Sequence, residues 1–220
     1  MIPEISLETI FSYFKKQNLK LDFPCLSYEG GNTSLYEQIV ICSILRTLYP
    51  ARILELGTFN GRTTINMAAN TSGIIYTVDL PVFQKTKLKC EDGTEYNELG
   101  YMWRKNKLFT NTVFGLKISQ IWCDTANLTF ETFDNSSFDF IFIDASHSYE
   151  YCLNDSLLVK SFLKENGVII WHDYNGWPGV TKAIHALYEE ENKAFNKDGF
   201  YHIRDTSLAI YFNSSVIKEN

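Results

Sequence analysis

Two apolar runs of the chain end in side chains that could bind a metal ion or move a proton. The first lies in Phe142-Ile-Asp-Ala-Ser-His-Ser-Tyr-Glu150 and the second in Gly167-Val-Ile-Ile-Trp-His-Asp-Tyr174. Apolar runs of this kind are typical of buried parallel strands, so neighbouring strands would bring Asp144, His172 and Asp173 to one rim. Two carboxylates and an imidazole suit a divalent cation such as Mg²⁺ or Mn²⁺. Mg²⁺ fits this ligand set less well than Mn²⁺, because it prefers oxygen ligands to imidazole.

A third motif joins a strand to a helix through two glycines. It reads Arg52-Ile-Leu-Glu-Leu-Gly-Thr-Phe-Asn-Gly-Arg-Thr-Thr64. Gly57 and Gly61 let the backbone pass close to a ligand, and the N–H groups that begin the next helix favour a carboxylate or phosphate. The motif differs from the dinucleotide fingerprint, which needs a glycine where Phe59 stands. It predicts the cofactor corner of an α/β sheet.

Acidic residues also stand at successive strand ends, where open α/β sheets bind their ligands. Asp79 ends the second strand, where a carboxylate could accept two hydrogen bonds from a ribose diol. Asp124 follows the third strand, with Thr125 beside it. Each acid alone could equally be a helix cap or a solvent-facing loop residue. Three of them, Glu55, Asp79 and Asp124, at three successive strand ends favour the ligand-binding interpretation.

The order of the expected elements indicates an α/β fold. Strands alternate with helix-length segments, which is the pattern of βαβ units and a parallel sheet. The final segment, Gly199–Phe212, predicts instead two short strands that form an antiparallel hairpin. The expected strands are Ile53–Leu56, Ile74–Asp79, Lys117–Trp122, Phe138–Asp144 and Val168–Trp171. The expected helices lie near Leu35–Leu48, Arg62–Ala69, Tyr149–Leu163 and Gly179–Glu190, after a first helix capped by Ser6.

Composition indicates one domain that handles a small molecule. The 220 residues, 45% hydrophobic and 21% charged, are enough for one well-buried core and short for two. A net charge of −6 argues against nucleic acid, whose phosphates reward basic faces. The longest apolar stretch, Ile39–Leu48, is broken by Arg46 and too short to span a membrane. The N-terminus lacks the features of a secretory signal, and five scattered cysteines are expected to be reduced thiols in a cytoplasmic protein.

Two segments are expected to surround the substrate. Residues 1–50 form an N-terminal helical segment, which is a candidate surface for the substrate or for a homodimer partner. Residues 81–112 are longer than a usual connection and aromatic-rich, so they predict an inserted lid or, with equal weight, a surface helix packed on the sheet. Tyr149, Tyr174 and Trp177 are candidates for an aromatic acceptor pocket, although ordinary packing explains them at least as well.

The glycine motif resembles the first motif of class I S-adenosyl-L-methionine-dependent methyltransferases. This resemblance implies a Rossmann-like sheet of seven mostly parallel strands with a C-terminal antiparallel hairpin and helices on both faces. It also implies a cofactor site that includes the methionine end of S-adenosyl-L-methionine at the glycine loop. The implied cofactor-binding residues are Glu55, Gly57, Thr58, Asn60, Gly61, Asp79, Asp124, Thr125 and Asp144.

From about Tyr36 to Val180 the chain is similar to the metal-dependent catechol and caffeoyl-CoA O-methyltransferases, and closer still to the methyltransferase-24 group. The resemblance places Asp144 at a metal-ligand position that also serves catalysis. It places His147 at the position of a lysine general base, and His172 with Asp173 at the position of an Asp-Asn pair. His for Lys and His-Asp for Asp-Asn are departures from the family pattern, and they leave metal dependence open.

The expected reaction is an in-line transfer of a methyl group from the sulfonium to a substrate oxygen. A metal held by Asp144, His172 and Asp173 would lower the pKa of the hydroxyl, and His147 would remove its proton. The acceptor could be a sugar, a secondary metabolite or a catechol-like ring. The alternatives are a metal-independent N- or S-methyltransferase, a nicotinamide-dependent oxidoreductase on a similar sheet, and a methyltransferase-like binding subunit without catalysis.

Overall fold

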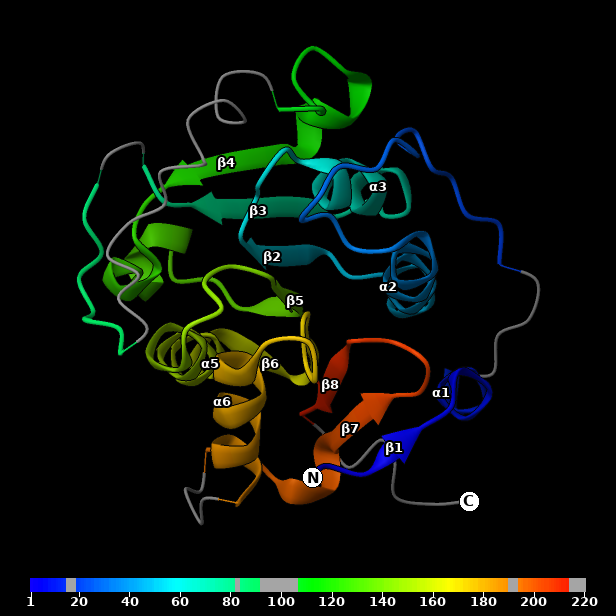
Figure 1. Ribbon diagram of the computed structural model, residues 1–220. Coiled ribbons are helices and arrows are strands. Elements are labelled where there is room, and N and C mark those ends of the chain that lie inside the picture. Colours follow the sequence, from blue (N-terminus) through cyan, green and yellow to red (C-terminus); the bar gives the residue numbers. More distant parts are fainter. Residues whose placement is uncertain (15–18, 82–83, 92–106, 190–193, 214–220) are drawn as a thin grey trace.

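A sheet of eight strands forms the centre of the computed structural model, which describes residues 1–14, 19–81, 84–91, 107–189 and 194–213 (Figure 1). The strand order is β1-β7-β8-β6-β5-β2-β3-β4, and every neighbouring pair is parallel except those that β8 makes with β6 and β7. The strands are β1 (Glu4–Ile5), β2 (Arg52–Leu56), β3 (Ile74–Asp79), β4 (Ile118–Trp122), β5 (Phe138–Ile143), β6 (Leu163–Trp171), β7 (Phe200–Ile203) and β8 (Ala209–Phe212). The expected α/β sheet with its terminal hairpin is confirmed.

Helices cover both faces of this sheet (Figure 1). One face carries α1 (Leu7–Phe14), α2 (Leu35–Leu48) and α3 (Arg62–Ala69), and the other carries α5 (Tyr149–Phe162) and α6 (Pro178–Glu189). Short 3-10 turns occur at Val113–Lys117, Thr125–Asn127, Phe130–Phe133 and Lys197–Gly199. Within the described residues, no helix has the length and apolar character that crossing a membrane requires.

Alternation along the strands separates the interior into two cores. In β2, Leu54 and Leu56 pack towards α5 and α6, whereas Ile53 packs towards α2 and α3. Burying each such side chain contributes about 1.5–3 kcal/mol, so the two cores supply most of the favourable free energy of folding. Glu55 shares the parity of Ile53 and is fully buried. A carboxyl group therefore occupies a core position directly before the glycine loop.

Most element boundaries lie within a residue or two of those expected. α2 begins after Ser34, whose side chain accepts from the Glu37 N–H while the Glu37 carboxylate accepts from the Ser34 N–H, a complete capping box. α3 also has the expected bounds. β6 differs, since it starts at Leu163 and not at Val168. The segment before Val168 is mostly polar, so it lacks the apolar run by which the sequence predicts a buried strand.

The expectation of seven strands is corrected to eight. The added strand, β1, lies at the edge of the sheet parallel to β7 and contains only Glu4 and Ile5. It is held by backbone hydrogen bonds from the His202 N–H to the Pro3 carbonyl at 2.7 Å and from the Arg204 N–H to the Ile5 carbonyl at 3.0 Å. Two residues are too few to produce a strand periodicity, which explains why the sequence pattern does not reveal it.

The parallel pairing continues one residue beyond the strands and fixes the rim where the predicted site lies. The Asp144 N–H donates to the Leu56 carbonyl at 2.8 Å, and the His172 N–H donates to the Ile143 carbonyl at 3.0 Å. Gly57 has φ +93°, and a Cβ atom there would lie 1.8 Å from the Asp144 carbonyl oxygen. The glycine loop and the loop after β5 therefore touch through their backbones.

The expected lid falls largely outside the described residues, because residues 82–83 and 92–106 are not described. The parts on either side are anchored to the sheet. Lys87 donates its N–H to the Asp124 carboxylate at 2.7 Å, and Leu108 donates its N–H to the Asn60 carbonyl at 2.9 Å. Both ends of the insertion thus lie at the carboxyl ends of the strands.

We expect Gly57→Ala to lower the free energy of unfolding by more than about 2 kcal/mol, because the new Cβ would overlap the Asp144 backbone at a left-handed φ. Urea denaturation measures this change. Gly30→Ala is the matched control, since no atom lies within 4 Å of a Cβ at that position. Equal stability of the two variants would contradict the close approach of the two loops.

Candidate active site

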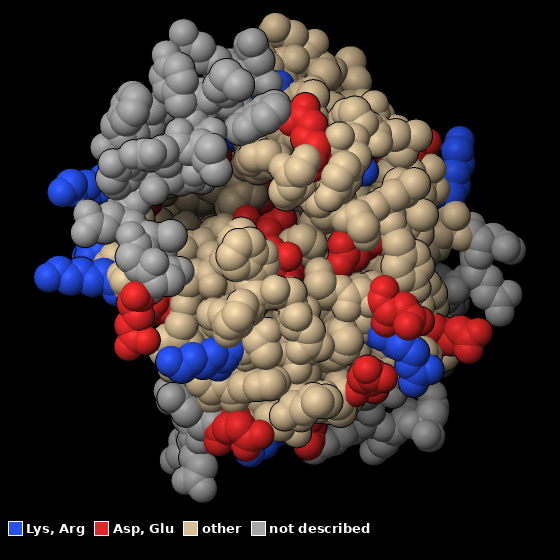
Figure 2. Space-filling model, viewed as in Figure 1, with Lys and Arg blue, Asp and Glu red and all other residues tan. Residues whose placement is uncertain are grey.

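Asp144, His147 and Asp173 converge at the carboxyl ends of β5 and β6. Each offers one ligand atom, and these atoms lie within 4.8 Å of one another. The His147 Nε2 atom is 2.7 Å from the Asp173 Oδ2 atom, and the His147 side chain is 38% exposed. Figure 2 shows acidic side chains around a hollow on the face seen in Figure 1. The cluster combines an accessible imidazole with two partly buried carboxylates.

The His147 ring is held between a charge and an aromatic plane. Ser148 caps α5 and accepts a hydrogen bond from the Tyr151 N–H, which places His147 just ahead of the first helical turn. Trp177, in the turn before α6, stacks on the imidazole with ring centroids 4.6 Å apart and an interplanar angle of 14°. Asp173 and Trp177 together fix the plane of the ring.

His172 is buried among three carboxylates. Its Nδ1 atom lies 3.2 Å from both Asp144 Oδ1 and Asp173 Oδ2, and its Nε2 atom lies 3.4 Å from Glu37 Oε2. Burial alone would lower the pKa of His172, but attraction and hydrogen bonding to Asp144, Asp173 and Glu37 outweigh it and raise that pKa to about 12. These three carboxylates therefore favour the protonated form of the ring.

The expected metal ligands are thus brought together, but with different roles. Asp144 and Asp173 point into one cluster, and His172 lies between them in contact with both. His147 supplies the imidazole nitrogen that completes the group with metal-ligand spacing. The predicted set of Asp144, His172 and Asp173 is also brought together, since His172 Nδ1 lies 3.2 Å from both carboxylates.

Glu37 connects this cluster to the N-terminal helical segment. Its carboxylate accepts hydrogen bonds from the Ser207 N–H at 2.8 Å and the Ser207 hydroxyl at 2.6 Å, in addition to its contact with His172. Burial opposes ionisation, but the hydrogen bonds from His172, Ser207 and Ser34 hold the pKa of Glu37 well below its usual range. Glu37 is an anion that joins α2 to the β7–β8 turn and the end of β6.

The cofactor corner contains a buried acid with an unused oxygen. Glu55 Oε2 accepts from the Thr64 hydroxyl at 2.5 Å and the Thr77 hydroxyl at 2.6 Å. Its Oε1 atom is buried and has no hydrogen-bond partner among the described residues. Burial raises the pKa of Glu55 to about 8, against the opposing hydrogen bonds of the two threonines. A buried polar atom without a partner is costly, so it marks a place where a ligand group fits.

The side chains of the glycine loop are engaged within the protein. Thr58 shares a hydrogen bond with Thr77 at 2.7 Å, and Asn60 accepts from the Arg62 N–H at 3.0 Å. Gly61 begins α3 in a left-handed conformation with φ +83°. What the loop offers to a ligand is therefore its backbone and not the side chains of Thr58 and Asn60.

Asp79 stands at the end of β3, where the sequence places it. Its Oδ1 atom accepts from the Leu80 N–H at 3.0 Å, and its Oδ2 atom accepts from the Lys107 ammonium at 3.0 Å. The side chains of Asp79 and Lys107 are 17% and 4% exposed. The carboxylate is thus oriented before any ligand arrives.

Asp124 is used more heavily by the protein than the sequence suggests. The Tyr151 hydroxyl is 2.9 Å from both of its oxygens, and the N–H groups of Lys87 and Ala126 also donate to it. Asp124 is almost fully buried, as is Thr125 beside it. Its carboxylate orders this corner, so a ligand here would meet chiefly the surrounding backbone.

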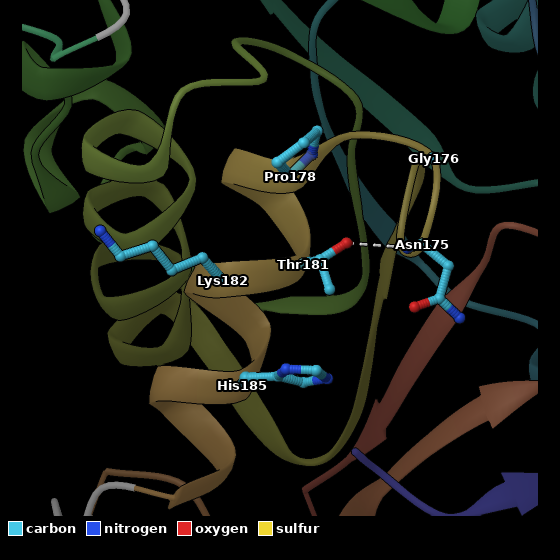
Figure 3. A pocket seen from close by; sticks show the side chains of 6 residues that line it. All are labelled: Asn175, Gly176, Pro178, Thr181, Lys182 and His185. Carbon is cyan, nitrogen blue, oxygen red and sulfur yellow. Dashed lines mark hydrogen bonds between the residues drawn. The ribbon is translucent and has the colours of Figure 1, made fainter.

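Two open depressions flank the turn that follows β6. One, of about 530 Å³, lies against α6 and is lined by Asn175, Gly176, Pro178, Thr181, Lys182 and His185 (Figure 3). The other, of about 760 Å³, lies between this turn, the start of α2 and the β7–β8 turn, with Glu37 in its wall. Of the three candidate acceptor aromatics, Tyr174 is fully buried and its hydroxyl is 2.9 Å from His185 Nε2, whereas Trp177 is half exposed.

Some residues of the site are not singled out by the sequence. Glu37, Lys107 and Tyr151 each contact a predicted site residue from a distant part of the chain. Glu37 has a signal, since Ser34 and Glu37 have the spacing of a capping box, but that signal predicts only a helix start. Lys107 and Tyr151 lie in no motif.

Comparison with known families identifies this arrangement. A family model described as a methyltransferase domain, Methyltransf_24, matches residues 54–174, more than half of the chain. The chain belongs to this methyltransferase family. The match runs from β2 to the turn after β6 and so contains both the cofactor corner and the His147 cluster. A search of curated protein sequences finds no match.

Solved structures share the fold of this methyltransferase at low identity. A putative caffeoyl-CoA O-methyltransferase from Staphylococcus aureus is 16% identical, with a TM-score of 0.59 over 86% of this chain and 85% of that chain. An O-methyltransferase from Bacillus cereus in complex with SAH is 14% identical, with a TM-score of 0.53 over 84% of each chain. A TDP-rhamnose 3'-O-methyltransferase of calicheamicin biosynthesis is 12% identical, with a TM-score of 0.53 over 80% of this chain and 79% of that chain. These likenesses establish the class I methyltransferase fold.

We expect Glu55→Gln to change how stability depends on pH. The folded pKa of Glu55 is raised from 4.5 to about 8, so folding takes up a proton between these values, and the stability present below pH 4.5 is lost as the pH rises towards 8. This loss is about 1.4 kcal/mol per pH unit for one proton. The glutamine variant lacks it and should gain stability relative to the wild type between pH 5.5 and 8.

Urea denaturation at pH 5.5 and pH 8 measures the difference. Glu165→Gln, at an exposed position of β6, controls for the general loss of one negative charge. A Glu55→Gln effect that is equal at the two pH values would show that the buried acid is not protonated in the folded state.

Proposed function

We propose that the protein transfers a methyl group from S-adenosyl-L-methionine to a hydroxyl group of a small molecule. The observation that carries this proposal is the short contact between His147 Nε2 and Asp173 Oδ2, 2.7 Å, on the same rim as the cofactor corner. A histidine oriented by a carboxylate is the usual arrangement for a general base. Membership of the methyltransferase family supports the reaction class and gives no support to the nicotinamide-dependent alternative.

Three features of the corner suit the cofactor. The unpartnered Oε1 atom of Glu55 fits the ammonium group of the methionine end, directly or through water, because that positive charge favours the ionised form of the carboxyl group. The left-handed backbone at Gly57 and Gly61 shapes a tight loop that packs on Asp144 and Phe109 and can offer its backbone N–H groups to the cofactor. The oriented carboxylate of Asp79 fits a ribose diol, as the sequence predicts. When bound, the cofactor supplies an electrophilic methyl group on its sulfonium.

In this proposal His147 removes the hydroxyl proton as the acceptor oxygen attacks the methyl group. Asp173 accepts from Nε2–H and leaves Nδ1 as the basic atom. Trp177 keeps the ring in that orientation. Positioning of the two reactants supplies much of the remaining acceleration, since a near-attack geometry is worth about 7–11 kcal/mol.

The cluster also fits a divalent metal ion, which would be held by Asp144, His147 and Asp173. Bound there, the ion would act as a Lewis acid towards the acceptor. Two oxygens and one imidazole nitrogen suit Mn²⁺ better than Mg²⁺. His147 Nε2 cannot bind the ion while it donates to Asp173. In the metal-assisted version His147 is therefore a metal ligand, whereas in the direct-base version it is a free base that a bound ion would block.

The proposed acceptor is a small molecule that carries a hydroxyl group. We infer a small molecule, such as a sugar, a secondary metabolite or a catechol-like ring, that reaches His147 past the exposed face of Trp177.

A homodimer is the proposed assembly, because large apolar side chains stand exposed on the N-terminal segment. These are Leu26, Tyr28, Leu35, Tyr36 and Ile39.

Isothermal titration with S-adenosylhomocysteine tests the cofactor assignment. We expect micromolar binding to the wild type and binding at least about tenfold weaker to Asp79→Asn, which loses charge-assisted hydrogen bonds to the ribose. Glu165→Gln should bind as the wild type does. The absence of binding to the wild type would overturn the proposed cofactor.

A His147→Gln variant tests the base assignment in a methyl-transfer assay with a panel of hydroxyl acceptors. We expect kcat to fall about 100-fold or more while KM and the affinity for S-adenosylhomocysteine stay near the wild-type values. His185→Gln, in α6, is the control. Full turnover by His147→Gln would exclude the role of base, and activity that requires added Mn²⁺ after chelation would favour the metal-assisted version.

A further inference from the structure

Lys107 lies at the centre of the cofactor corner, although no motif predicts it. Its side chain is 4% exposed, and its ammonium group donates to Asp79 Oδ2 at 3.0 Å. The same ammonium group donates to the carbonyl of Phe59 in the glycine loop. It also lies 5.2 Å from the ring centroid of Trp122, the last residue of β4. One buried cation therefore contacts Asp79 and the glycine loop of the proposed cofactor site, and it lies beside the end of β4.

The backbone that carries Lys107 is fixed to the same loop. The Leu108 N–H donates to the Asn60 carbonyl at 2.9 Å. The Phe109 ring packs against Gly61, where a Cβ atom would lie 2.8 Å from it. These contacts fix the backbone next to Lys107 against the glycine loop. The Lys107 side chain therefore extends from a fixed position towards Asp79.

The contacts of Asp79 leave it suited to a diol. A carboxylate offers about four acceptor positions, two on each oxygen. Among the described residues, Leu80 uses one position on Oδ1 and Lys107 uses one on Oδ2. With respect to the described part of the chain, one position remains on each oxygen, which is the pair that two adjacent hydroxyl groups require.

We propose that Lys107 is a positioning residue that holds the Asp79 carboxylate for the ribose hydroxyls of the cofactor. The inference rests on the proposed function, since it names how that cofactor is recognised. Lys107 acts through Asp79 and does not replace it. Its second contact, to Phe59, keeps the glycine loop and the ribose acceptor at a fixed separation.

A lysine suits this position because its charge and its reach are both used. A carboxylate that is largely withdrawn from water is unfavourable unless it is paired, and the ammonium group supplies the pair. Its three donors can serve Asp79 and the Phe59 carbonyl at once. A methionine of similar length would fill the space but orient neither acceptor.

The test is a thermodynamic cycle between Lys107 and a hydroxyl group of the ligand. S-adenosylhomocysteine and its 2'-deoxy and 3'-deoxy analogues are titrated into the wild type, Lys107→Met and Asp79→Asn. We expect Lys107→Met to weaken S-adenosylhomocysteine binding about tenfold or more. The loss should be much smaller for at least one deoxy analogue, because the hydroxyl that the oriented carboxylate recognises is then missing.

Two further proteins keep the result interpretable. The double variant Lys107→Met/Asp79→Asn removes the unpaired charge, so it should fold if Lys107→Met does not, and it should bind no more weakly than Asp79→Asn alone. Lys182→Met, on α6 outside this corner, should bind as the wild type does.

The outcomes separate the two proposals. If the wild type binds none of these ligands, the proposed cofactor itself is wrong. If the wild type binds S-adenosylhomocysteine but Lys107→Met binds it equally well, the role of Lys107 is wrong. An equal loss for the parent ligand and both deoxy analogues would also overturn it, since Lys107 would then act on the fold of the loop and not on ribose recognition.

Discussion

The site depends on one buried cation that compensates three carboxylates. Glu37, Asp144 and Asp173 approach His172 from α2 and from the ends of β5 and β6. Without a positive charge among them, these largely buried acids would repel one another. A protonated His172 turns that repulsion into the contact that joins the N-terminal helical segment to the catalytic rim. The sheet supplies the register, and this ion cluster holds the loops that extend beyond it.

The proposed reaction divides the rim into two halves that the backbone joins. Glu55, Gly57 and Asp79 form the cofactor half, whereas Asp144 and His147 form the acceptor half. Gly57 packs directly on the Asp144 carbonyl, so the separation of the two halves is set by backbone atoms and not by side-chain conformation. A transferred methyl group needs such a fixed separation, because the two reactants must meet in line. Glycine at position 57 is therefore required both for a stable fold and for the correct separation of cofactor and acceptor.

The sequence predicts the strands, the helices and the residues at their ends, because each of these depends on local patterning. It does not predict partners that arrive from far along the chain. Glu37 lies 135 residues from His172, and Lys107 lies 28 residues from Asp79. The same limit explains the roles of the two histidines. Spacing shows that His147 and His172 reach one rim, but it does not show that His172 is buried against Asp144, Asp173 and Glu37, which raise its pKa, while the His147 side chain stays accessible.

The stack of Trp177 on His147 has an electrostatic consequence for the proposed proton transfer. Once His147 takes up a proton, its positive ring faces the electron-rich face of an indole while Asp173 lies at its edge. The indole stabilises this cation without adding a formal charge that would also attract the cation of the cofactor. The Trp177 ring thus stabilises the transient positive charge on His147 while remaining uncharged itself. Because Trp177 is half exposed, the imidazole stays open to solvent, and the proton can leave to water before the next turnover.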